Sequence, residues 1–364
     1  MSLATFGAFA LGLLLLTLGG DGLVRGASGI ARRFGITPLV IGLTVVAFGT
    51  SAPELVVSLT ATARGSFDIA VGNVVGSNIF NVLAILGLCA VVKPLVVAQQ
   101  LVFRDVPVMI AASLVVLFFG LDGRIGALEG GLLAAGLVWF CWDSVRASRR
   151  ETDQIRQEYE AVVPAGVGHG RGLWVDALVS LGSLVALVAG ARFLVSASVT
   201  AARALGLDEA VIGLTIVAAG TSLPEIATSL VATVRGERDI AVGNVIGSNV
   251  FNLLGILGAA ALASGGGLIV SPAIESFDLP VMTAVAVACL PLMARGHRIP
   301  RWQGVLFLAY YVAYTLYLVL SAREHAALDR FSAVMLEFVL PFTVATIAAL
   351  WVTGRRPESA PRER

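Results

Sequence analysis

Two glutamates stand in the middle of apolar segments, each directly after a proline. Glu54 ends the hexapeptide GTSAPE and Glu225 ends GTSLPE, and the residues around both are almost all apolar. An ionised carboxylate in hydrocarbon costs at least about 2.5 kcal/mol, so such residues face a protein interior and commonly mark an ion pathway. Pro53 and Pro224 lack a backbone N–H and clash with a carbonyl one turn back, which predicts a helix break beside each glutamate. Broken helices free carbonyl oxygens that a cation can meet.

Hydroxyl and amide side chains accompany both glutamates. They belong to the two hexapeptides and to a second motif, GNVVGSNIFN in one copy and GNVIGSNVFN in the other. The first copy contains Thr50, Ser51, Ser77, Asn78 and Asn81, and the second contains Thr221, Ser222, Ser248, Asn249 and Asn252. Carboxylate, hydroxyl, amide and carbonyl oxygens are the ligands that hard cations prefer, and Ca²⁺ takes about six to eight of them. The two copies together predict a cation site suited to Ca²⁺.

Two structural explanations compete with ion binding. Glycines and serines in apolar helices often serve close helix packing, and the GxxxG spacings at Gly72 and Gly243 fit that role. A buried glutamate can also be neutralised by an arginine, for which Arg25 and Arg192 are candidates. Neither arginine recurs at the equivalent position of the other copy, whereas both glutamates recur with all their oxygen-bearing neighbours. This difference favours ion binding.

The composition predicts an all-α polytopic membrane protein. The chain is 57% hydrophobic and 13% charged, whereas soluble domains carry about 25% charged residues. Apolar runs long enough to cross about 30 Å of hydrocarbon lie at 3–24, 38–62, 69–92, 106–121, 125–142, 173–202, 210–234, 240–263, 277–294, 302–320 and, interrupted by Glu337 and Pro341, at 331–353.

The two copies are parts of one long internal repeat. Shifting the sequence by 171 residues places 41–87 on 212–258 with 33 identities in 47 positions. Each copy has five spans, an odd number, so the second must enter the membrane from the opposite side. We expect a first repeat at 1–145, a cytoplasmic connector at 146–172, a second, inverted repeat at 173–321, and an extra C-terminal span at 331–353. Many secondary transporters are built from inverted repeats around a site at the membrane midplane.

The distribution of basic residues predicts the orientation in the membrane. With the N-terminus outside, 18 lysines and arginines fall on the side of the connector and the C-terminus, and 5 fall on the other side. Cytoplasmic loops carry the excess of such residues. We therefore expect a multi-pass protein of the plasma (inner) membrane, with the N-terminus outside and the connector and C-terminus in the cytoplasm.

Other classes of function find little support. Cys89, Cys141 and Cys289 lie far apart in apolar runs, as free thiols do, and the histidines His169, His297 and His325 lie away from the glutamates. The segment GVGHGRG lacks the strand, helix and GK[ST] ending of a phosphate-binding loop. The net charge is +1 and no basic patch interleaved with aromatic residues occurs, so nucleic acid is not an expected partner. We expect no enzyme activity, no cofactor and no obligatory protein partner; the partners are the transported ions and the lipid bilayer.

The paired motifs resemble the α-repeats of the cation/calcium antiporter superfamily, and specifically those of prokaryotic sodium/calcium exchangers. The resemblance covers the second, third, seventh and eighth spans, and hydropathy extends it to ten. It implies ten helices in two inverted halves, with Glu54 and Glu225 as shared ligands of Ca²⁺ and Na⁺. It also implies hydroxyl ligands from Thr50, Thr221, Ser51, Ser222, Ser77 and Ser248, backbone carbonyls from Ala47 and Ala218, and amide oxygens from Asn81 and Asn252. Some relatives have Asp at the position of Asn252. Because this chain has Asn there, its site holds only two carboxylates.

Neighbouring carboxylates in a low dielectric cannot both stay ionised without cations, which favours competition between ions and hence exchange. Sodium entering down its gradient would displace Ca²⁺, with the first and sixth spans moving against the repeat core. A Ca²⁺/H⁺ antiporter of the same superfamily is the alternative, because protons can also neutralise the glutamates. A passive cation channel is more remote, since mirrored helix breaks suit a carrier with two gates better than a continuous pore.

Overall fold

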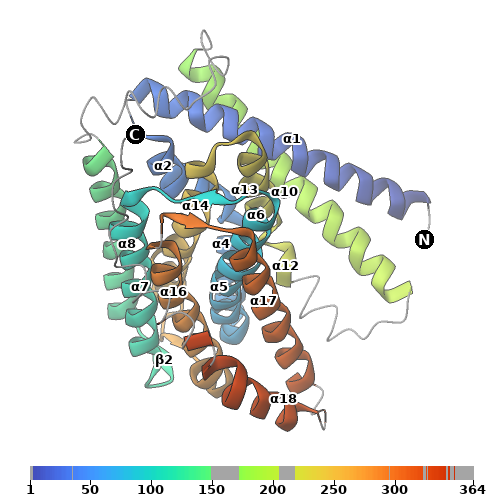
Figure 1. Cartoon of the computed structure of the whole chain (residues 1–364), viewed down its shortest axis with the longest axis vertical. Coiled ribbons are helices and arrows are strands. Elements are labelled where there is room, and N and C mark those ends of the chain that lie inside the picture. The colour runs from blue at the N-terminus through green and yellow to red at the C-terminus, as the bar shows by residue number, and fades with distance from the viewer. Residues whose placement is uncertain are drawn as a thin grey trace, which may run out of the picture.

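The computed structural model describes residues 3–34, 36–148, 172–204, 218–294, 296–322, 325, 327–341, 343–344 and 348. Their secondary structure is almost entirely helical, as the composition predicts (Figure 1). The first half consists of α1 (Leu3–Phe34), α2 (Pro38–Ile41), η1 (Gly42–Val46), α3 (Ala47–Thr50), α4 (Ala52–Ala63), α5 (Phe67–Phe80), η2 (Asn81–Leu86), α6 (Gly87–Val92), β1 (Leu95–Val96), η3 (Leu101–Asp105), α7 (Val106–Gly120), β2 (Arg124–Ile125) and α8 (Ala127–Ser148), where η marks a π-helical turn.

The second half repeats this order. It consists of α10 (Leu173–Ala204), α12 (Ala218–Gly220), α13 (Leu223–Arg235), α14 (Arg238–Val250), η5 (Phe251–Ile256), α15 (Leu257–Ala263), β3 (Leu268–Ile269), η6 (Ile274–Asp278), α16 (Leu279–Ala294), β4 (Arg298–Ile299) and α17 (Arg301–Ala322). Beyond it lie α18 (Leu328–Val334) and η7 (Met335–Val339).

Within the described residues, eight helices are long and apolar enough to cross a membrane, and the bent pair Pro38–Thr50 with Ala52–Ala63 makes a ninth span. The expected seventh span, 210–234, begins outside the described residues. Most of the connector and part of 331–353 also lie outside them. The fourth span starts at Leu101, five residues before the expected start, because the turn η3 continues helically into α7. The predicted class of an all-α polytopic membrane protein is confirmed.

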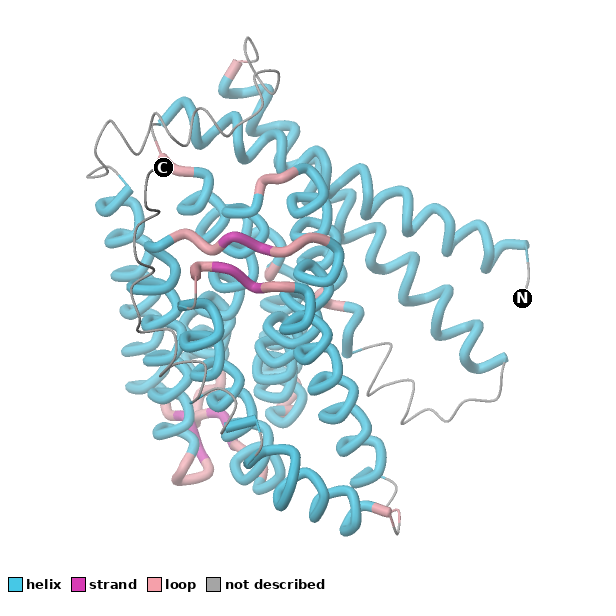
Figure 2. Tube along the Cα trace, in the orientation of Figure 1, coloured by secondary structure: helices cyan, strands magenta, loops and turns pink. Residues whose placement is uncertain are grey.

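Two short antiparallel ladders join the halves. Leu95 of β1 pairs with Ile299 of β4, and Ile125 of β2 pairs with Leu268 of β3. β1 and β3 occupy equivalent places in the two repeats, and so do β2 and β4. Each ladder therefore pairs the first strand of one repeat with the second strand of the other. Figure 2 shows the two ladders toward opposite ends of the helix bundle. An element and its repeat counterpart thus lie at opposite ends, which supports the inverted arrangement expected from an odd number of spans.

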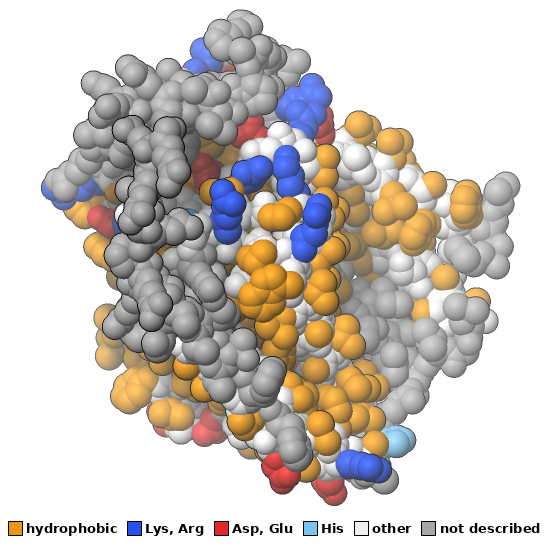
Figure 3. All heavy atoms as spheres, viewed as in Figure 1, with side chains coloured by type: hydrophobic (Ala, Val, Ile, Leu, Met, Phe, Trp, Pro, Cys, Tyr) orange, Lys and Arg blue, Asp and Glu red, His pale blue; other side chains and the backbone are white. Residues whose placement is uncertain are grey.

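The repeat helices occupy the centre of the molecule. About 78% of the apolar window in Phe67–Val92 and 83% of that in Arg238–Ala263 is buried, against 6% for α17. Gly243 and Gly247 of α14 let it approach η1 closely: a Cβ on Gly243 would lie 3.0 Å from the Leu39 carbonyl oxygen, and one on Gly247 would collide with Leu43. Both contacts are possible because glycine has no side chain, as close packing of membrane helices requires. The outer helices present apolar side chains on the flank seen in Figure 3, as a lipid-facing surface does.

Helices α1 and α10 pair along their length and extend away from the bundle (Figure 1). Glycines set their separation. A Cβ on Gly12 would lie 2.9 Å from the Gly190 carbonyl oxygen, and one on Gly19 would lie 2.9 Å from the Ser183 carbonyl oxygen. The second contact is the repeat counterpart of the first, so the pair is symmetric about its middle.

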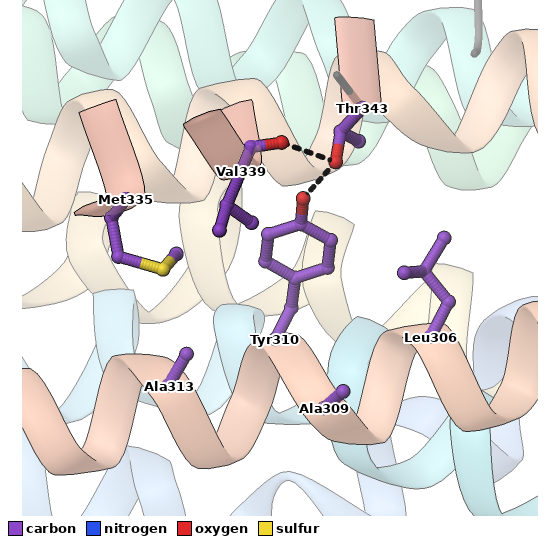
Figure 4. Close-up of a pocket in the computed structure, with 7 residues that line it drawn as sticks. All are labelled: Leu306, Ala309, Tyr310, Ala313, Met335, Val339 and Thr343. Atoms are coloured by element: carbon purple, nitrogen blue, oxygen red, sulfur yellow. Dashed lines mark hydrogen bonds between the residues drawn. The ribbon is translucent and has the colours of Figure 1, made fainter. Parts of the chain in front are cut away.

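The helical segment beyond the repeats packs on α17. Tyr310 of α17 donates a hydrogen bond to the Thr343 hydroxyl, which donates to the Val339 carbonyl at 2.8 Å (Figure 4). An apolar cavity of about 460 Å³ lies beside these groups. It is lined by Leu306, Ala309, Tyr310, Ala313, Met335, Val339 and Thr343. None of these residues belongs to the motifs that carry the glutamates.

Candidate functional site

Each glutamate lies just after a helix break. α3 ends at Thr50, Ser51 leaves the helical conformation at φ −80° and ψ 5°, and α4 continues from Ala52 at an angle of 45° to the preceding helix. Ser222 repeats this geometry, at φ −88° and ψ 10°, ahead of α13. The prolines stand in the first turn of α4 and α13, where their missing N–H costs nothing. The predicted breaks are therefore present, two residues before each proline.

The break places both carboxylates in the first turn of a helix. Glu54 and Glu225 are each 1% exposed and each occupies the N-terminal turn of its helix, α4 or α13. Unpaired N–H groups give this end of a helix a partial positive charge, which stabilises a carboxylate. The fold thus holds two carboxyl groups inside the protein, each at the N-terminal end of a helix.

Hydroxyl groups from the opposite half bind both glutamates. Ser222 donates from its Oγ to Glu54 Oε1 at 2.9 Å, and Ser51 donates from its Oγ to Glu225 Oε1 at 3.1 Å. Ser77 extends the first contact, because its Oγ lies 3.3 Å from Ser222 Oγ. Each carboxylate is therefore oriented by the helix break of the other repeat, and the two motif copies form one site.

The second oxygen of each carboxylate has no hydrogen-bond partner among the described residues. Glu54 Oε2 and Glu225 Oε2 are both buried. The same holds for four further buried oxygens of the predicted set: Asn81 Oδ1, Asn252 Oδ1, Ser248 Oγ and Thr221 Oγ1. A buried polar atom without a partner costs about 1 to 3 kcal/mol, and a bound cation would satisfy several of these at once. Oxygen ligands of this kind suit hard cations such as Ca²⁺ and Na⁺.

The site contains few charged groups. Among the described residues, no three His, Cys, Asp or Glu side chains cluster in a way that could hold a metal ion. Two carboxylates supplemented by neutral oxygens remain. Such a donor set would hold a cation less tightly than an all-carboxylate cage.

The remaining predicted residues lie around this centre with different roles. Thr50 donates from its hydroxyl to Asn244 Oδ1 at 3.1 Å and lies 3.3 Å from the Ala47 carbonyl oxygen. That carbonyl also accepts from the Ser51 backbone N–H at 3.0 Å, so the helix break leaves it hydrogen-bonded. Ala218 begins α12, immediately before the second break.

Asn73 and Asn244 were missed as part of the site. Asn73 donates from Nδ2 to the Glu54 backbone carbonyl at 3.2 Å and to Ser58 Oγ at 2.9 Å. Asn244 donates to Ser229 Oγ at 3.0 Å. Both stand in the GN dipeptide that opens the second motif in each copy, so their recurrence was the signal that could have found them.

The amide residues Asn81 and Asn252 lie at the start of π-helical turns. Asn81 is the first residue of η2, and Asn252 is the second residue of η5. π-Helical turns are rare and occur mostly at functional sites, where they redirect side chains. In both halves, the amide residue predicted to face the ion thus lies in the equivalent π-helical turn.

Comparison with known proteins identifies the family. The family model described as sodium/calcium exchanger protein matches residues 4–143 and 175–320. The chain belongs to this family. It is 39% identical to the putative antiporter CaxA of Alkalimonas amylolytica, over 85% of this chain and 97% of that protein. It is 34% identical to the sodium/calcium exchanger MaX1 of Methanosarcina acetivorans, over 85% of this chain and 96% of that protein.

A solved structure agrees with this assignment. The sodium-calcium exchanger NCX_Mj, soaked with 2.5 mM Na⁺ and 0.1 mM Ca²⁺, superposes with a TM-score of 0.72 at 32% identity, covering 86% of this chain and 97% of that chain. The exchanger described here is thus a membrane cation/calcium antiporter of the sodium/calcium exchanger type.

Proposed function

We propose that this exchanger moves Ca²⁺ against Na⁺ by alternating access to one site that contains Glu54 and Glu225. One observation carries the proposal: each glutamate has one oxygen fixed by a serine of the opposite half and one buried oxygen that none of the described residues contacts by a hydrogen bond. A single Ca²⁺ neutralises both charges, and so do two Na⁺ ions. The two cations therefore compete for the same oxygens, and the empty, doubly charged site is the unfavourable state.

The other ligands of the proposed site are neutral. They are the hydroxyls of Thr50, Thr221, Ser51, Ser222, Ser77 and Ser248, the amide oxygens of Asn81 and Asn252, and the backbone carbonyls of Ala47 and Ala218. The unpartnered oxygens of Thr221, Ser248, Asn81 and Asn252 give these four residues the strongest support. Ala47 has the weakest, because its carbonyl already accepts a hydrogen bond from the Ser51 N–H and also lies 3.3 Å from the Thr50 hydroxyl.

Unequal packing of the two halves supports alternating access. α1 lies against α13: a Cβ on Gly20 would lie 3.0 Å from the Ala227 carbonyl oxygen, and Asp21 forms an ion pair with Arg235. The residues equivalent to Asp21 and Arg235 are both arginines, Arg192 and Arg64, so the second half cannot form this ion pair. The counterpart of Ala227, Val56 of α4, is 59% exposed, so α10 does not cover α4 in the same way. A carrier requires such a difference, because closing one gate opens the other.

The orientation proposed is the one with the N-terminus outside. Lys93 lies just before β1 and Arg298 is the first residue of β4, and Figure 3 shows lysine and arginine side chains gathered at that end. This end would face the cytoplasm, with the connector 146–172 joining the repeats 1–145 and 173–321 on the same side. Side-specific labelling of a cysteine introduced at Gly123, beside the other ladder, tests it: reaction from the cytoplasm would reverse the orientation.

The coupling ion can be determined in proteoliposomes. We expect an outward Na⁺ gradient to drive ⁴⁵Ca²⁺ uptake at a clamped membrane potential, and an imposed pH gradient alone to drive none. The reason is that Na⁺, like Ca²⁺, coordinates the neutral oxygens as well as the carboxylates, whereas a proton uses only a carboxylate. Uptake driven by the pH gradient alone would establish a Ca²⁺/H⁺ antiporter. Uptake that needs neither counter-ion would indicate a channel.

A further inference from the structure

Four asparagines meet where α5 and η2 contact α14 and η5. Asn81 and Asn252 belong to the proposed ligand set, while Asn78 and Asn249 precede them by one helical turn. Asn252 donates from Nδ2 to Asn78 Oδ1 at 3.1 Å, and Asn81 donates from Nδ2 to Asn249 Oδ1 at 3.0 Å. All four side chains are at most 2% exposed. Each proposed ligand is thus bound by an asparagine of the other half.

Backbone carbonyls fix the orientation of Asn78 and Asn249. Asn78 donates from Nδ2 to the Asn249 carbonyl oxygen, and Asn249 donates from Nδ2 to the Asn78 carbonyl oxygen, both at 3.4 Å. The same nitrogens also face sulfur acceptors, Met282 Sδ at 3.7 Å and Met109 Sδ at 3.4 Å. A carbonyl oxygen and a thioether can only accept. The Nδ2 atom of each of these two amides must therefore face the carbonyl oxygen and the sulfur, and the Oδ1 atom must face the opposite way.

This orientation determines which atom of each ligand amide faces away from the asparagine contact. The Oδ1 atoms of Asn78 and Asn249 need a donor, so Asn252 and Asn81 must present their Nδ2 atoms to them. The Oδ1 atoms of Asn81 and Asn252 are then turned away, and both are buried with no hydrogen-bond partner in the part of the chain that the structure describes. A reversed amide would present N–H groups to the ion, and these repel a cation.

The geometry points to Asn78 and Asn249 as positioning residues that set the polarity of the ion-binding amides across the interface between the halves. This inference rests on the proposed function, because it assumes that Asn81 and Asn252 meet the transported cation. It also replaces the sequence-based expectation that Asn78 and Asn249 supply further oxygens to the ion. Their oxygens are already occupied by the ligand amides.

Two substitutions at Asn78 separate positioning from packing. Asn78→Leu keeps the size of the side chain but removes both polar atoms. We expect the apparent KM for Ca²⁺ in Na⁺-driven exchange to rise about 10- to 100-fold, the range for losing a partner that orients a metal ligand, with a smaller change in maximal rate. Asn78→Asp, when protonated, has one donor and one acceptor in the same places and should stay within about threefold of the wild type. A packing role predicts the opposite order.

The test depends on which of the two variants has the higher apparent KM for Ca²⁺. A Leu variant with wild-type KM, or an Asp variant as impaired as the Leu variant, would overturn the inference. If the Leu variant does not fold, Asn78→Ala takes its place, because it leaves space instead of strain. Failure of the proposed function is distinct, since the wild type itself would then show no Na⁺-driven exchange.

A second measurement uses Asn252→Asp as the background. Both terminal atoms of a carboxylate are oxygens, so its orientation no longer matters to the ion. The rise in KM caused by Asn78→Leu should therefore shrink at least about threefold in this background, as expected when two residues act through one contact. An equal rise in both backgrounds would show that Asn78 acts on the fold and not through the amide of Asn252.

Discussion

Glu54→Gln and Glu225→Gln are each expected to abolish Ca²⁺ exchange in a protein that still folds and inserts. Glutamine keeps the size of the side chain and can still accept a hydrogen bond from Ser222 or Ser51, but the charge is lost. Breaking a buried charge pair costs about 3 kcal/mol or more, which corresponds to a loss of more than about 100-fold in ion affinity. Because the two glutamates are held in equivalent ways, the two losses should be similar. Na⁺-driven ⁴⁵Ca²⁺ flux in proteoliposomes measures both.

Glu275→Gln provides the matched control. Glu275 lies in η6, also within a membrane-spanning helix, but outside both motifs. Its exchange rate should stay close to that of the wild type. Substantial Ca²⁺ exchange in either folded glutamine variant of the site would rule out a shared site. A large loss in only one of them would show that the halves contribute unequally.

Gly190→Leu is expected to reduce exchange at least about tenfold, because overpacking a close helix contact costs about 1 to 3 kcal/mol. A Cβ on Gly190 would lie 2.9 Å from the Leu16 backbone nitrogen and 3.0 Å from the Gly12 carbonyl oxygen. These are backbone atoms, which cannot move aside as a side chain can. The substitution therefore separates α1 from α10, the pair proposed to move as one body. Flux measured on the folded, purified variant tests the effect.

Gly182→Leu is the control for this prediction. Gly182 lies on α10 as well, but it is exposed and a Cβ there would meet no atom within 4 Å. Leucine at this lipid-facing position should leave exchange unchanged. Equal exchange in the Gly190 and Gly182 variants would show that close packing of α1 on α10 is not needed for transport.

The elements that repeat in sequence were the most predictable. The helix breaks beside Pro53 and Pro224 follow from the chemistry of proline, and the burial of Glu54 and Glu225 follows from the cost of a charge in hydrocarbon. Both features are local, so a single sequence contains them. Within the described residues most spans were likewise predictable from apolar length, although those of α1, α7, α8 and α16 begin or end several residues away from the predicted bounds.

Contacts across the two halves could not be predicted in this way. The sequence places Ser51 beside Glu54, yet Ser51 binds Glu225, because the breaks of the two repeats face each other. The same limit applies to Asn78, whose amide oxygen serves Asn252 and not the ion directly. Nor do two nearly identical motifs reveal that α1 packs on α13 while Val56 of α4 stays exposed. Two nearly identical motifs can therefore pack differently, and only the fold shows how each one packs.

The central claim is that Glu54 and Glu225 bind one transported ion together, and a crystal soaked in Ca²⁺ tests it most directly. We expect one anomalous-scattering peak between the two carboxylates, with Glu54 Oε2 and Glu225 Oε2 both within about 2.3 to 2.6 Å of the ion. The peak should disappear when Na⁺ replaces Ca²⁺ in the soak. A Ca²⁺ ion that contacts only one of these glutamates, or that binds elsewhere while both Oε2 atoms stay uncoordinated, would contradict the shared site.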